Sequence, residues 1–108
     1  MNLQEQFQQI IEFRRSNRKF DPEVKVPSEV IERSLQRAIL SPNSSNMQLW
    51  EFHWVSSSAE KAQVAELCLG QSAARTAQEL VVFVTRPDKW KQRKDWHLAQ
   101  VQKEINGE

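Results

Sequence analysis

The sequence predicts a small α+β domain, because helical and strand-like apolar patterns follow one another along the chain. Apolar residues recur at helical spacing in residues 3–14 and 28–40, which is typical of amphipathic helices. Residues 51–55 alternate, and residues 80–85 form an unbroken apolar run; both patterns favour strands. These 108 residues suffice for one domain, arranged either as α+β or as a three-layer α/β fold.

Two amphipathic helices are expected in the N-terminal part. The first carries an apolar stripe at positions i, i+4, i+7 and i+8 from Leu3, and Asn2 is a suitable cap at its start. The second begins after Ser28, a good N-cap residue, and ends before Pro42. A turn at residues 20–22 separates the two helices, because proline biases the residue before it away from helix.

The second half of the sequence predicts two strands joined by helices. Ser57 opens a capping-box pattern and a helix through about residue 69, and a short helix is expected over residues 71–79. The run at 80–85 is typical of a strand covered on both faces, and the polar chain from residue 88 onward favours another helix. Because a two-stranded sheet is marginal alone, we expect part of the fold to be missing from this chain.

The composition indicates a soluble protein without a metal centre. Apolar residues make up 39% and charged residues 27% of the chain, and the net charge of +1 gives no basic bias toward nucleic acid. No apolar run approaches the roughly 20 residues of a membrane helix and no signal-peptide pattern is present, so we expect a cytoplasmic protein. Cys68 is expected to be a small core residue, and His53 and His97 lack metal-ligand spacing.

A basic cluster, Arg14-Arg15-Ser16-Asn17-Arg18, follows the first predicted helix. Guanidinium groups this close repel one another unless an anion lies between them, and their planar forks match phosphate oxygens. Glycine occurs only at positions 70 and 107, which excludes a Gly-rich phosphate loop, so side chains would have to bind a phosphate. The alternative is that Arg14 stabilises the C-terminal end of the helix and aids solubility.

A second polar cluster, the polar loop, follows the second predicted helix at Ser41–Phe52. It combines small hydroxyl and amide residues with two bulky aromatic ones: Ser41, Asn43, Ser44, Ser45, Asn46 and Gln48, then Trp50 and Phe52. A purely connecting loop rarely needs so many hydrogen-bonding side chains, whereas a loop that holds a planar polar ligand does. We therefore predict that the basic cluster and the polar loop are halves of one site for an anion and a ring.

Together, in this order and at this spacing, the two clusters resemble the nitroreductase family of FMN-dependent oxidoreductases. Family members typically read RRSxRxF near the N-terminus and PSSxNxQPWxF downstream, and this chain reads RRSNRKF and PNSSNMQLWEF. The segment rich in glycine, glutamine and alanine after the third helix, and the strand that ends in Arg86-Pro87-Asp88, are also similar. The resemblance covers roughly residues 7–90.

The resemblance implies an α+β fold of the nitroreductase type, a three-layer α-β-α sandwich, of which residues 1–108 are the N-terminal half. It also implies a homodimer with FMN at the subunit interface, NAD(P)H as hydride source, and a nitroaromatic, quinone or related small-molecule acceptor. In such enzymes the flavin carries the redox chemistry, so we expect no catalytic side chain. Neither nucleic acid nor a membrane is expected as a partner.

The resemblance also assigns cofactor contacts to individual residues. The basic cluster is expected to hold the FMN phosphate and ribityl chain and, through Arg18, the N1/O2 edge of the flavin. The polar loop is expected to reach the partner subunit's flavin, ordered by Asn46 and Gln48, while Gln71 corresponds loosely to a polar residue near the ring. The full set is Arg14, Arg15, Ser16, Arg18, Pro42, Asn43, Ser44, Asn46, Gln48 and Gln71.

The sequence departs from the family pattern at Asn43, where serine is usual, at Leu49, where proline is usual, and in its length, since a family domain is about twice as long. Two alternatives therefore stay open. One is a truncated, non-catalytic fragment that acts at most as an interaction module, with an open sheet edge. The other is a small protein that binds nucleotides or nucleic acid through its basic loop, against which the near-neutral charge argues.

Overall fold

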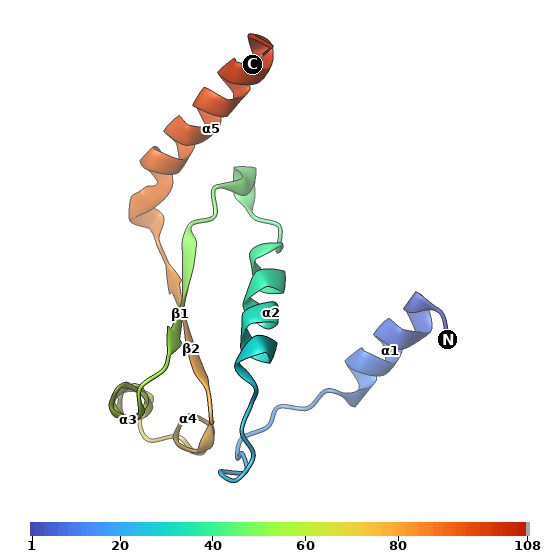
Figure 1. Ribbon diagram of the computed structural model, residues 1–108, viewed down its shortest axis with the longest axis vertical. Coiled ribbons are helices and arrows are strands. Elements are labelled where there is room, and N and C mark those ends of the chain that lie inside the picture. Colours follow the sequence, from blue (N-terminus) through green and yellow to red (C-terminus); the bar gives the residue numbers. More distant parts are fainter. Residues whose placement is uncertain (108) are drawn as a thin grey trace.

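The computed structural model describes residues 1–107 and confirms the α+β class and the order of the predicted elements (Figure 1). Two helices precede the first strand, two shorter ones connect it to the second strand, and a long helix follows. The bounds are α1 Leu3–Phe13, α2 Ser28–Ile39, β1 Trp50–Val55, α3 Ser58–Leu67, α4 Ser72–Thr76, β2 Leu80–Thr85 and α5 Trp90–Ile105, with single 3₁₀ turns η1 at Ser44–Asn46 and η2 at Pro87–Lys89.

Local hydrogen bonds explain where two of the helices begin. Asn2 and Glu5 form a reciprocal capping box at the start of α1, each side chain accepting the other residue's backbone N–H at 2.9 Å. Ser57 Oγ accepts the N–H of Glu60 at 3.1 Å and caps α3 as predicted. These caps depend only on residues three positions apart, so the sequence suffices to predict them.

The predicted boundaries of two helices are wrong. Ser28 lies inside the first turn of α2, because the chain becomes helical directly after Pro27. Helix α4 ends at Thr76, since Ala77 is already extended and leads toward β2.

Cys68 is exposed rather than part of a core, because it lies in the turn just beyond the end of α3.

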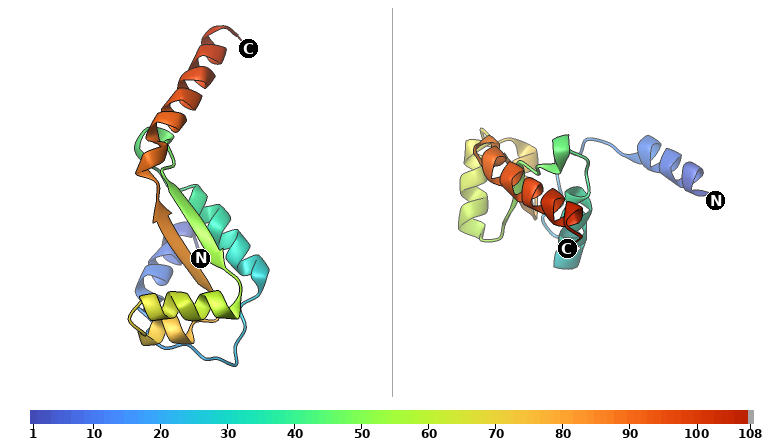
Figure 2. Two further views of the ribbon diagram at one scale, coloured as in Figure 1. Left: turned by 90° about the vertical axis from the view of Figure 1, so that its left-hand side faces the viewer. Right: turned by 90° about the horizontal axis from the view of Figure 1, so that it is seen from above.

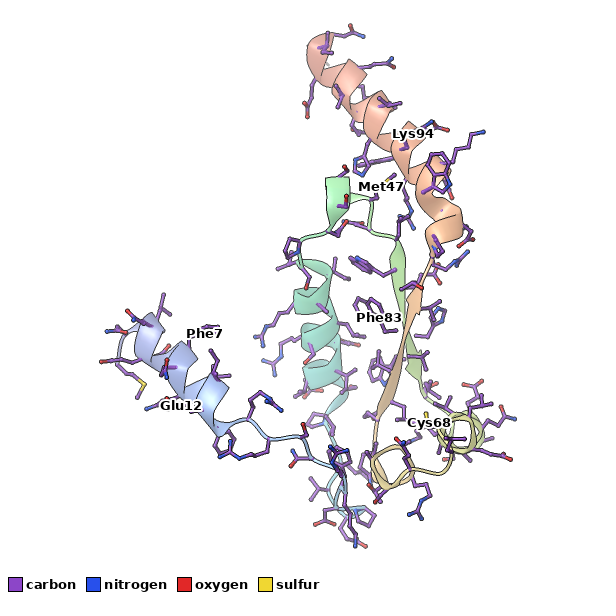
Figure 3. All side chains as sticks on the ribbon, turned by 180° about the vertical axis from the view of Figure 1, so that it is seen from behind. Phe7, Glu12, Met47, Cys68, Phe83 and Lys94 are labelled. Carbon is purple, nitrogen blue, oxygen red and sulfur yellow. The ribbon has the colours of Figure 1, made fainter. Side chains whose placement is uncertain are left out.

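Strands β1 and β2 form one antiparallel pair in a continuous register that begins with Trp50 opposite Thr85. Phe52 stands opposite Phe83, and their ring centroids lie 5.2 Å apart in an edge-on arrangement. Figure 3 shows Phe83 pointing toward α2, which runs alongside this face of the sheet. The pair therefore offers an aromatic face to α2 and carries the polar loop at the end where Trp50 begins.

The chain buries little of its apolar surface. Among residues 1–107, Val55 and Ala65 are the buried apolar residues, whereas 64% of Phe7 on α1 is exposed. The Cα radius of gyration is 18.8 Å, against about 13 Å for a compact domain of this length. The accessible surface is 9271 Å², against about 6,200 Å² for a compact protein of this mass. Helices α1 and α5 project away from the sheet (Figure 2), so their apolar stripes lie open.

The expectation that β2 is covered on both faces is wrong for the described part of the chain. Val81 is 40% and Phe83 is 58% exposed. Both side chains lie on the same face of the sheet, opposite Trp54 and Phe52 of β1, and the segments within residues 1–107 leave this face partly open to solvent.

An ion-pair network at the end of the sheet joins β1 to the turn after β2. The guanidinium of Arg86 binds Asp88 through two hydrogen bonds of 3.1 and 2.9 Å and also pairs with Glu51, which accepts a hydrogen bond from His53 at 3.0 Å. The hydrogen bond from His53 and the charge of Arg86 lower the pKa of Glu51 against the opposing effect of desolvation. The hydrogen bonds from Arg86 likewise lower the pKa of Asp88.

These depressed pKa values predict an acid-sensitive contribution to stability. Both folded-state pKa values lie below the ordinary values of 4.5 for Glu51 and 3.8 for Asp88, so the contribution is complete above those values and is lost as the pH falls through the folded-state values. The variant Glu51→Gln/Asp88→Asn should therefore unfold at lower urea concentration than the parent at neutral pH, and the difference should vanish in acid. Urea titrations followed by circular dichroism measure it.

The matched control is Glu32→Gln, which removes a carboxylate from α2 where no ion pair is present within residues 1–107. Its unfolding midpoint should differ little from the parent at either pH. A midpoint difference for Glu51→Gln/Asp88→Asn that stays constant from neutral to acidic pH would contradict the assignment of this network.

Candidate functional site

The centre of the polar loop adopts an unusual backbone. Ser45, Asn46 and Gln48 have φ angles of 51°, 50° and 54°, in the left-handed region that non-glycine residues rarely occupy. Each such residue costs on the order of 1–3 kcal/mol unless its surroundings hold it in place. A connection between a helix and a strand does not need this conformation, so the contacts that hold the loop are informative about the site.

The loop is closed by its own amide side chains. Asn43 Oδ1 accepts the backbone N–H of Gln48 at 2.8 Å, and Asn43 Nδ2 donates to the carbonyl of Ser41 at 3.2 Å. Gln48 Nε2 donates to Asn46 Oδ1 at 3.2 Å. These hydrogen bonds brace the loop, and Asn43, at a position where serine is usual, supplies the one that crosses it; contacts of Asn46 and Gln48 with a flavin stay a prediction.

The hydroxyls of the loop are differently placed from its amides. Ser44 and Ser45 are exposed, and their side chains make no hydrogen bond to any residue between 1 and 107. Pro42 is exposed at the start of the loop, directly after α2. The amides thus build the loop while two hydroxyls remain available to a ligand.

The basic cluster lies in an exposed, extended segment after α1. Arg14 Nη2 donates to Ser16 Oγ at 3.2 Å, which holds these two candidate residues together. Arg15 Nη1 instead donates to the backbone carbonyls of Glu12 at 2.6 Å and Arg14 at 2.8 Å, so it satisfies the end of the helix. The helix-stabilising role considered for Arg14 therefore falls to Arg15. Within the described chain, Arg18 has neither an ion pair nor a hydrogen bond from its side chain.

Within one chain the basic cluster and the polar loop do not meet. The segment after α1 lies beyond the start of α2, and the polar loop follows its other end (Figure 1). Helix α2 has 12 residues and is therefore about 18 Å long. The predicted joint site is not formed by a single copy, and its formation between two subunits stays a prediction.

Gln71 also lies away from the polar loop. It precedes α4, at the opposite end of the sheet (Figure 1). The chain just after the basic cluster is tied to this region, because the N–H of Phe20 donates to Thr76 Oγ1 at 2.9 Å and Gln78 Nε2 donates to the carbonyl of Pro22 at 2.7 Å. Gln71 and the basic cluster thus belong to the same end of the molecule.

Helix α5 contributes residues beside the loop that the sequence did not point to. A cavity of about 340 Å³ lies between them, with Met47 and Gln48 on the loop side and Arg93, Trp96 and His97 on the α5 side. Figure 3 shows Met47 next to this helix. The only sequence signal is that Arg93 and His97 are four positions apart and so share a helix face; nothing local indicates which part of the chain that face meets.

No group of three or more histidine, cysteine, aspartate or glutamate side chains in residues 1–107 could hold a metal ion. In the same range, no helix is long and apolar enough to cross a membrane. His53 is exposed and bound to Glu51, which fits an ordinary surface histidine.

Comparison with known proteins gives the same family as the resemblance of the basic cluster and the polar loop. A family model described as "Nitroreductase family" matches residues 11–105. YdgI of Bacillus subtilis (strain 168), which carries the name of an NAD(P)H nitroreductase, is 33% identical over 78 residues, which are 72% of this chain and 37% of YdgI.

Solved structures of similar proteins match the fold. A nitroreductase-like protein from Streptococcus mutans superposes with a TM-score of 0.77 at 23% identity, over 96% of this chain and 50% of that one. A protein from Exiguobacterium sibiricum that carries the name of a nitroreductase, solved in complex with FMN, gives a TM-score of 0.68 at 28% identity, over 87% and 47% of the two chains. A protein from Staphylococcus epidermidis that carries the name of an NAD(P)H:FMN oxidoreductase gives 0.74 at 23% identity, over 92% and 47%.

The chain thus spans half or less of the length of each of these relatives. The family match itself covers nearly all of residues 1–108 and includes the whole basic cluster and the whole polar loop. The chain belongs to the nitroreductase family.

Proposed function

We propose that this chain is part of an FMN-dependent oxidoreductase that moves hydride from NAD(P)H to a small acceptor such as a nitroaromatic or a quinone. The observation that carries the proposal is the polar loop, whose amides brace a left-handed backbone while the hydroxyls of Ser44 and Ser45 stay free. The FMN complex of the Exiguobacterium sibiricum relative, and the NAD(P)H in the names of two others, support the choice of cofactor and co-substrate.

The residues of the basic cluster fit a flavin phosphate. Arg14 and Arg18 are exposed, and no carboxylate among residues 1–107 neutralises either of them. A phosphate would accept a charge-assisted hydrogen bond from Arg14 and a further one from Ser16, while Arg18 would lie at the N1/O2 edge of the flavin ring. The hydride-transfer chemistry would come from FMN when it is bound, and the protein would bind and orient it. This fits the expectation that no side chain acts as a general acid or base.

We further propose that two copies of the chain share each site, the basic cluster of one facing the polar loop of the other. The two segments lie at opposite ends of α2, so a second copy would be needed to bring them together. The accessible surface of the chain is about 3,000 Å² larger than that of a compact protein of the same mass. An excess of this size is within the range of area that obligate dimers bury. The open apolar stripes of α1 and α5 would supply that contact, and a complete three-layer sandwich would cover β2.

A second candidate function is that of a non-catalytic interaction module. It is favoured by the small buried core, Val55 and Ala65 among the described residues, and by the chain's spanning at most half of its relatives. The two candidates differ in whether the chain takes up FMN, which an experiment can decide.

We expect the purified chain mixed with FMN to retain the flavin on desalting and to show its visible absorption band. NADH or NADPH added without oxygen should bleach that band, because the bound flavin accepts hydride. A desalted protein without flavin absorption would defeat the oxidoreductase proposal for this chain and favour the interaction module.

The variant Arg14→Ala should bind FMN more weakly by about 1.5–3 kcal/mol, or tenfold and more in Kd, because a charge-assisted hydrogen bond is lost. Quenching of flavin fluorescence measures the affinity. The control Arg33→Ala removes the same charge from the exposed surface of α2 and should leave Kd within about twofold of the parent. Equal Kd values for Arg14→Ala and the parent would remove Arg14 from the site.

A further inference from the structure

One side chain of α5 binds the backbone of the polar loop, and neither the resemblance to the family nor the comparisons assign a role to it. His97, on α5, lies with Nε2 2.7 Å from the backbone carbonyl of Asn46, 51 positions earlier in the chain. We propose that His97 is a positioning residue that holds the loop in its left-handed conformation by donating a hydrogen bond to Asn46.

The chemistry of the contact fixes the state of the imidazole. A backbone carbonyl can only accept, so Nε2 of His97 must carry the proton. Both the neutral Nε2–H tautomer and the imidazolium satisfy this requirement, whereas the neutral Nδ1–H tautomer does not. The ring of Trp96 stands edge-on to the imidazole, with centroids 5.0 Å apart.

The bond acts where the backbone is strained. Asn46 has a φ of 50° and lies between Ser45 and Gln48, the two other non-glycine residues of the loop with positive φ. On the far side of Gln48, the carbonyl of Leu49 accepts the backbone N–H of Arg86 at 2.8 Å. The two bonds bracket Met47 and Gln48, so the end of the loop is fixed at two points.

Helix α5, which carries His97, is attached to the end of β2. The turn η2 connects β2 to the start of α5, and the Arg86 side chain donates two hydrogen bonds to Asp88 within that turn. The same Arg86 supplies the backbone bond to Leu49. Helix α5 and the end of the loop are therefore attached to one point, the end of β2, and His97 joins them a second time.

Other α5 residues beside the loop do not share this role. Gln92, Arg93 and Trp96 line the cavity with His97, yet none of their side chains donates a hydrogen bond to the loop in the part of the chain that the structure describes. The loop's strained carbonyl thus has one side-chain donor there, and that donor is His97.

A consequence for ligand binding rests on the proposed function. The free hydroxyls of Ser44 and Ser45 directly precede Asn46, so their positions depend on the backbone that His97 holds. His97 would then affect FMN affinity through the loop, without a contact of its own to the cofactor.

Hydrogen exchange of the full chain tests the positioning role. In His97→Phe, which keeps a ring beside Trp96 but has no donor, the amides of Asn46, Met47 and Gln48 should exchange about three- to tenfold faster than in the parent. Amides of α2 should be unchanged. His97→Gln keeps an N–H donor and should restore most of the protection. Loop exchange equal to the parent in His97→Phe, or equal in His97→Phe and His97→Gln, would overturn the proposal.

A measurement on the unmodified protein needs no variant and so stands even if His97→Phe unfolds. The ¹⁵N chemical shifts of the His97 ring in alkaline buffer should show the proton on Nε2; a proton on Nδ1 would overturn the proposal. FMN titration of the same proteins separates the two claims. If the parent chain fails to bind FMN, the proposed function fails, while the exchange and tautomer results still decide the role of His97.

Discussion

The antiparallel pairing of β1 with β2 is the interaction on which the rest of the structure depends. It fixes Phe52 against Phe83 at its centre and presents this face to α2. At one end, Arg86 binds the backbone of Leu49 and the side chains of Glu51 and Asp88, which holds the polar loop and α5 at the same place. The other end carries α3 and α4. Two strands alone give little burial, and a two-stranded sheet is marginally stable by itself.

The basic cluster and the polar loop are far apart in a chain that buries little of its apolar surface. Helix α1 and the basic cluster extend to one side, and the polar loop lies beyond the other end of α2. The chain belongs to the nitroreductase family and superposes on about half of a solved nitroreductase-like structure. Both observations fit our proposal that a second copy covers the exposed apolar faces. In our proposal, the surface that covers them also completes the flavin site.

Features set by neighbouring residues could be predicted from the sequence. The caps at Asn2 and Ser57 and the polar loop itself follow from local composition. The left-handed backbone at Asn46 could not be predicted, because it depends on His97, 51 positions away. Likewise, the sequence indicates an arginine at the end of α1, but whether Arg14 or Arg15 folds back depends on how the chain leaves the helix. Exposure of β2 also escaped prediction, since an apolar run indicates a covered strand without saying what covers it.

Complementation between two damaged chains tests the shared site most directly. One chain would carry Arg14→Ala/Ser16→Ala and the other Asn43→Ala/Ser44→Ala, so that neither binds FMN alone. If each site takes its basic cluster from one copy and its loop from the other, a mixed dimer has one intact site, and about a quarter of all sites should recover FMN in a random mixture. Co-expression followed by flavin absorbance measures this. No recovery in the mixture, while the parent chain binds FMN, would contradict a site shared between two copies.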